Sequence, residues 1–167
     1  RLLSVAPLSV PHPLAYTGSL ESAGADQRDR SWYFDWFQTP EATDELLADG
    51  AERLRAVYTA TGLTEADADA YVDRLGDREA LDAALNWYRA SGIELIRGLG
   101  PITVSTLHVW STEDLALGPE AAHATGDHVE GPYRFEALEG VGHWIPEQAA
   151  DRCTELLLTH FAGADAP

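Results

Sequence analysis

The chain has 167 residues, of which 45% are hydrophobic and 23% charged, as in a globular domain with a sizeable core. Its 28 acidic residues outnumber its 11 lysines and arginines, and the net charge of −17 argues against nucleic acid or an anionic membrane surface as a partner. No apolar stretch is long enough for a membrane span, and the single cysteine, Cys153, cannot form an internal disulfide. We therefore expect a cytoplasmic protein.

The first two thirds of the chain predict one strand followed by helices. Residues 2–10 are apolar and strand-like, and they lead into two prolines that end any regular element. Residues 14–30 are polar and predict a loop or a short helix. From about residue 42 to residue 98, apolar residues recur at helical spacing and predict three helical segments. Thr64 is expected to be an N-cap because acidic residues follow it in the first turn.

After Pro101 the pattern changes to alternation of apolar and polar positions. It predicts a strand at 103–110, a short helix at 119–124, a second strand at 133–138 and an amphipathic helix at 147–161. Strand–helix–strand order implies parallel strands, so the fold class is α/β: the second half of a parallel sheet with a helical insertion. The expected divisions are a core strand and turn at 1–13, a helical lid at 14–98 and an α/β core segment at 99–167.

Two predicted loops follow strands, where ligand sites in open α/β sheets gather. Residues 111–118 carry Asp114, with Glu113 as a rival acid, and residues 140–146 carry His143. Either residue alone is more often structural than catalytic. Together, at neighbouring strand ends, the carboxylate can fix the imidazole tautomer and stabilise the imidazolium. The order of acid before histidine is that of α/β hydrolases, whose nucleophile comes earlier in the chain.

Five motifs, in order and over essentially the whole chain, resemble the epoxide-hydrolase branch of the α/β hydrolases. They are Ser-Val-Pro-His-Pro at 9–13, Ser-Trp-Tyr-Phe-Asp-Trp-Phe-Gln at 31–38, Ala-Leu-Asn-Trp-Tyr-Arg at 84–89, Val-Trp-Ser-Thr-Glu-Asp-Leu-Ala-Leu-Gly at 109–118 and Gly-Val-Gly-His-Trp-Ile-Pro at 140–146. The resemblance implies the C-terminal part of an α/β-hydrolase fold with a helical lid. It also implies hydrolysis of a small, mostly apolar epoxide without a cofactor.

The resemblance assigns roles to single residues. Tyr33 and Tyr88 match the two lid tyrosines whose phenols hold the epoxide oxygen and donate to it as the ring opens. A phenol with a pKa of about 10 suits a developing alkoxide, although either ring alone is more often lid core. Asp114 matches the charge-stabilising acid, and His143 matches the base that activates water against an ester intermediate. The residues expected to line the substrate pocket are His12, Trp32, Trp87 and Trp144.

Two departures from the family pattern stand out. Ser111 occupies a position where the family usually has glycine, which we expect to alter only the turn. No Gly-x-Ser-x-Gly or Gly-x-Asp-x-Gly elbow occurs in the 167 residues, so the nucleophile is absent and we expect the chain alone to be inactive. The strand-like start favours a fragment, which would pair with a complementary N-terminal hydrolase segment or with itself.

Three functions stay open on the sequence. The first is epoxide hydrolysis through an ester on an aspartate outside this chain. A serine elbow would instead make an esterase, and an aspartate with halide-binding side chains a haloalkane dehalogenase. The third is a non-catalytic fragment or binding protein that needs a complementary chain. No metal site is predicted, because ligand spacing is lacking among Cys153, His108, His123, His128 and His160.

Overall fold

The computed structural model describes residues 2–22, 26–90, 92, 96 and 98–164. They fall into two compact units, one formed by residues 1–30 with 98–167 and the other by residues 31–97. The helical character predicted around residues 93–95 lies outside the described residues. The helices of the described part include none long and apolar enough to cross a membrane.

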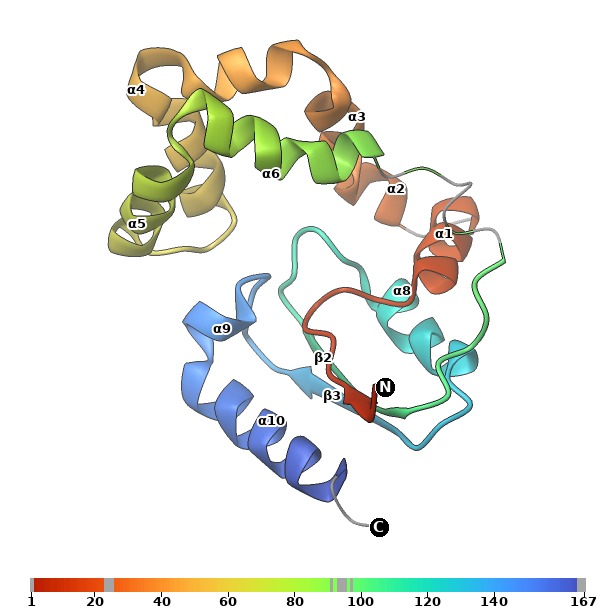
Figure 1. Ribbon diagram of the computed structural model, residues 1–167. Helices are drawn as coiled ribbons and strands as arrows, with labels where there is room; N and C mark the ends of the chain where they lie inside the picture. Colours follow the sequence, from red (N-terminus) through yellow and green to blue (C-terminus); the bar gives the residue numbers. More distant parts are fainter. Residues whose placement is uncertain (1, 23–25, 91, 93–95, 97, 165–167) are drawn as a thin grey trace. The chain divides into compact units, whose positions relative to one another are not determined.

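The first unit contains a three-stranded parallel sheet in the order β1-β2-β3 (Figure 1). The strands are β1 (Ser4–Val5), β2 (Ser105–Ser111) and β3 (Tyr133–Leu138). The parallel arrangement predicted from the element order is confirmed, and β2 pairs with β3 along six residues. The predicted first strand is shorter than expected, because Pro7 has no N–H to donate to a sheet. A single bridge from Leu8 to Val109 continues the alignment beyond it.

Alternation along β2 separates the two faces of this sheet. Leu107 and Val109 are fully buried in a core cluster with Cys153 and Leu156 of α10 (Ala150–Ala164). His108 and Trp110 point to the opposite face. There the indole of Trp110 contacts His123 of α8 (Pro119–Ala124). Helices α1 (Pro13–Glu21) and α8 pack together, as do α8 and the 3₁₀ turn η1 (Thr125–His128).

Several predicted boundaries of this unit are confirmed. Helix α8 and strand β3 have the predicted bounds, and β2 is shifted by one or two residues. Pro119 suits the first position of α8, where no N–H is needed. The single closing helix predicted at 147–161 is instead two helices, α9 (Ile145–Gln148) and α10, because Ala149 between them has non-helical dihedrals.

The second unit is helical. It contains α3 (Trp32–Gln38), α4 (Glu41–Ala60), α5 (Glu65–Leu75) and α6 (Arg78–Ala90). The predicted N-cap is confirmed, since the Thr64 hydroxyl accepts a hydrogen bond from the Asp67 N–H at 3.2 Å. Buried side chains recur along α4 and α6 at helical spacing, and they include Leu46, Leu54, Leu81 and Leu85.

The division into units differs from the predicted lid at 14–98. Helices α1 and α2 (Gln27–Arg30) cluster with the sheet, so the first boundary falls at residue 30. Helix α4 also bends in its middle, where Asp49, Gly50 and Ala51 all have positive φ angles. The glycine tolerates this conformation, whereas Ala51 adopts it at a steric cost.

Candidate active site

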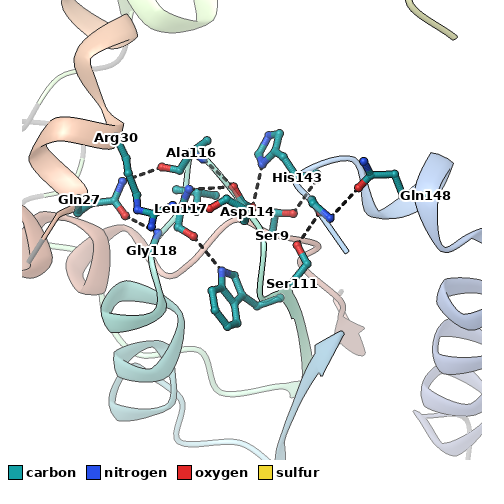
Figure 2. Close-up of polar contacts among 12 residues, drawn as sticks. Ser9, Gln27, Arg30, Ser111, Asp114, Ala116, Leu117, Gly118, His143 and Gln148 are labelled. Atoms are coloured by element: carbon teal, nitrogen blue, oxygen red, sulfur yellow. Dashed lines mark hydrogen bonds and ion pairs between the residues drawn. The ribbon is translucent and has the colours of Figure 1, made fainter. Parts of the chain in front are cut away.

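Asp114 lies in the loop that follows β2, residues 111–118, here called the acid loop. Its side chain is fully buried. One carboxylate oxygen, Oδ1, accepts hydrogen bonds from the N–H groups of Ala116 at 2.8 Å and Leu117 at 2.9 Å. The other, Oδ2, lies 2.9 Å from Nδ1 of His143 (Figure 2). The turn therefore fixes one oxygen and leaves the other for the histidine.

His143 lies in the loop between β3 and α9, residues 140–146, here called the histidine loop. Two serine hydroxyls support its backbone: Ser9 donates to the His143 carbonyl at 3.0 Å, and Ser111 donates to the Gly142 carbonyl at 2.6 Å (Figure 2). The Gly142 N–H donates to the Gln148 side chain at 2.8 Å. Ser111 thus does more than alter a turn, because its hydroxyl ties the acid loop to the histidine loop.

The pair has the geometry of a base and its orienting acid. The buried carboxylate favours the tautomer that carries its proton on Nδ1, which leaves Nε2 as the acceptor. The His143 side chain is 30% exposed, so part of the imidazole is open to water. The rival acid, Glu113, is exposed and does not pair with the histidine. The structure therefore brings together the acid and the histidine that the sequence singled out.

The two tyrosines lie together within the helical unit. Tyr33 of α3 and Tyr88 of α6 are both partly buried, with ring centroids 6.0 Å apart and planes at 84°. Phe34 and Phe37 pack against both rings. The arrangement gathers two phenols in one aromatic cluster. Their catalytic role stays a prediction, because the same contacts also serve packing.

The four expected pocket residues differ in surroundings. Trp32 and Trp87 are 64% and 73% exposed, while Trp144 packs edge-on against His143 with centroids 5.5 Å apart. His12 is buried, and its Nδ1 caps α1 by accepting from the Leu14 N–H at 3.2 Å. Burial, and then the stacked ring of His128, lower the pKa of His12. Lining of a pocket by these residues stays a prediction.

Two further residues, Gln27 and Arg30, contact the acid loop without any signal in the sequence. Gln27 and Arg30 of α2 hydrogen bond to the acid loop from about 90 positions earlier in the chain. A glutamine and an arginine in a polar segment carry no periodic or motif signal that could have revealed this. Within residues 2–22, 26–90 and 98–164, no group of three or more histidine, cysteine or acidic side chains could hold a metal ion.

The parallel sheet and the helices packed on it have the arrangement of the C-terminal part of an α/β-hydrolase fold. Solved structures agree: an epoxide hydrolase from Bacillus megaterium in complex with an inhibitor matches with a TM-score of 0.78 at 19% identity, over 96% of this chain and 61% of that one. Epoxide Hydrolase A from Mycobacterium thermoresistibile matches with a TM-score of 0.75 at 24% identity, over 98% and 62%. The predicted fold class is confirmed.

Two curated proteins similar to this chain are epoxide hydrolases. Epoxide hydrolase A of Mycobacterium tuberculosis (strain ATCC 25618 / H37Rv) is 25% identical, over 99% of this chain and 63% of its own length. Epoxide hydrolase 4 of Mus musculus is 27% identical, over 86% and 43%. No family model matches the chain. The resemblance to the C-terminal part of epoxide hydrolases is confirmed, and the chain spans only 43% to 63% of the length of these two relatives.

Proposed function

We propose that this chain supplies the acid, the base and the ring-opening phenols of an epoxide hydrolase whose nucleophilic aspartate lies outside the 167 residues. The observation that carries the proposal is the contact of 2.9 Å between His143 Nδ1 and the buried carboxylate of Asp114. The relatives support the substrate class, since a second Bacillus megaterium structure is described as complexed with its product, a propane-1,2-diol.

Ring opening is the first step of the proposed reaction. The external aspartate attacks an epoxide carbon, the carbon–oxygen bond breaks, and the epoxide oxygen takes a proton from the phenol of Tyr33 or Tyr88. The product is an alkyl ester on the aspartate and a tyrosinate. The contact between the two rings, whose centroids lie 6.0 Å apart, supports this role because both phenols belong to one cluster. An epoxide oxygen that reaches both hydroxyls can accept from each.

Ester hydrolysis is the second step. Nε2 of His143 takes a proton from water as the hydroxide attacks the ester carbonyl, and Asp114 stabilises the imidazolium. Collapse of the tetrahedral intermediate breaks the bond to the alkoxide, which takes the remaining hydroxyl proton and leaves as the diol, so the aspartate returns as a carboxylate. The proton on the imidazolium passes through water to the tyrosinate. Atoms and charges then return to their starting state.

The nucleophile comes from a polypeptide segment that completes the sheet. In the described part of the chain, β1 pairs with β2 on one side only. An unpaired strand edge favours addition of a further strand, so we propose that a segment bearing the nucleophile joins here.

The test begins with the intact protein under denaturing conditions, whose mass reveals whether a nucleophile-bearing segment is present. The protein is then incubated with a styrene-oxide-type substrate in ¹⁸O-water. The parent should form the diol. His143→Gln should accumulate the covalent ester between the aspartate and the opened epoxide, and its kcat should fall by about 10² to 10⁴-fold. Turnover of carboxylic esters or haloalkanes without epoxide turnover would favour the alternative hydrolases, and binding without turnover a non-catalytic protein.

A further inference from the structure

The turn that carries Asp114 has its backbone groups hydrogen bonded by side chains from outside the loop. The indole N–H of Trp110 donates to the Leu117 carbonyl at 2.9 Å. Gln27 of α2 makes two contacts: its amide donates to the Ala116 carbonyl at 2.8 Å and accepts from the Gly118 N–H at 2.8 Å (Figure 2). Arg30 donates to the Asp114 carbonyl. Helix α2 therefore contacts the turn at three backbone groups.

Gln27 meets a requirement that few side chains satisfy. One peptide group of the turn offers an acceptor and another offers a donor, and a single primary amide can serve both. Gln27 is only 1% exposed. All four residues of α2 are polar, so no apolar face of the helix explains why this glutamine is buried. A buried amide is retained where its hydrogen bonds are satisfied, and two partners of this one, the Ala116 carbonyl and the Gly118 N–H, belong to the acid loop.

We propose that Gln27 is a positioning residue for the acid–histidine pair, acting through the turn that holds Asp114. This inference rests on the proposed function. The N–H groups of Ala116 and Leu117 hold the carboxylate oxygen Oδ1 of Asp114. Gln27 in turn binds the carbonyl of Ala116 and the N–H of Gly118, the residue after Leu117. If that turn relaxes, Oδ2 moves relative to Nδ1 of His143.

The proposed reaction predicts which step depends on Gln27. Ester formation uses the external aspartate and the phenols, so it does not need the pair. Ester hydrolysis uses His143 as base and Asp114 as its orienting acid. Loss of Gln27 should therefore slow ester hydrolysis selectively, whereas general damage to the fold would slow both steps.

The experiment compares Gln27→Met with the parent in the intact protein. Methionine keeps the length of the side chain but neither polar contact. Rapid-quench mass analysis should show ester formation at the parent rate, ester hydrolysis slowed about 10- to 100-fold, and accumulated ester. The control is Ser22→Ala, a change five residues before Gln27. It removes the 2.8 Å hydrogen bond from Ser22 to Glu120, which is also distant in sequence, and it should change neither step.

Two further measurements keep the proposal falsifiable. Gln27→Glu retains the acceptor for the Gly118 N–H, so its ester hydrolysis should lie between those of the parent and Gln27→Met. The Nδ1–H proton resonance of His143 should be well resolved in the parent and shifted or broadened in Gln27→Met. This resonance is informative even if the parent forms no ester, in which case the proposed function fails separately. An unchanged resonance with unchanged ester hydrolysis, or equal loss of both steps, would overturn the role of Gln27.

Discussion

Replacing His108 by phenylalanine should make the fold less sensitive to acid. His108 lies in the middle of β2, is fully buried and contacts the ring of Phe135. Within the described part of the chain, neither ring nitrogen has a hydrogen-bond partner. Burial lowers the pKa of His108 to about 4 from its ordinary value of 6.5, and the nearby backbone of Ser9 and Ala122 offsets this only in part.

The sign and size of the effect follow from linkage. As the pH falls below 6.5 the unfolded chain takes up a proton at this residue, while the folded chain does not until the pH nears 4. His108 therefore destabilises the fold progressively over this window. The shift corresponds to about 3 kcal/mol, which is reached in full below pH 4.

Urea unfolding of the intact protein between pH 7.5 and pH 4 measures this contribution. The difference in unfolding free energy between His108→Phe and the parent should grow by about 3 kcal/mol as the pH falls, since carboxylates titrate alike in both proteins and cancel. A difference for His108→Phe that stays constant with pH would refute the reasoning.

Three smaller changes test other features. Ala51→Gly relieves the positive φ of 67° in α4 but also removes a buried methyl group, so it should stabilise the fold by only about 0.5 kcal/mol. Ala56→Gly, at an exposed position later in the same helix, should instead cost about 1 kcal/mol, and thermal unfolding distinguishes the two variants. Ser111→Gly removes the buried donor to the Gly142 carbonyl and should lower the unfolding free energy in urea by about 1 kcal/mol; an unchanged midpoint would contradict its linking role. Thr64→Ala removes the N-cap of α5 and should lower the unfolding free energy by about 1 kcal/mol in the same assay. An unchanged unfolding free energy would show that the cap does not stabilise the helix.

Local signals explain which parts of the fold were predictable. Alternation marked β3, Pro119 marked the start of α8, and Thr64 marked the start of α5, because each signal acts within a few residues. The pairing of Asp114 with His143 could be anticipated because parallel strands end at the same edge of a sheet.

Features that depend on distant contacts could not be predicted. Gln27 gains its role from an acid loop about 90 residues later in the chain. Ala149, which separates α9 from α10, is a residue type that favours helices, so the break there has no local signal. The bend in α4 had only Gly50 as a hint, while its two neighbours adopt left-handed angles without one.

The support of the histidine loop has a consequence for the order of folding. Ser9 pairs through its N–H with the Val109 carbonyl at 2.8 Å and reaches across 134 positions to the His143 carbonyl. Contacts so distant in sequence form late, because closing long loops costs chain entropy. We therefore expect His143 to take its final place after the segment that follows β1 has aligned on β2. During refolding, we expect the helices and the β2–β3 pair to form first and the contact between Ser9 and the histidine loop to form later. Secondary structure would then return before the Asp114–His143 pair is in place.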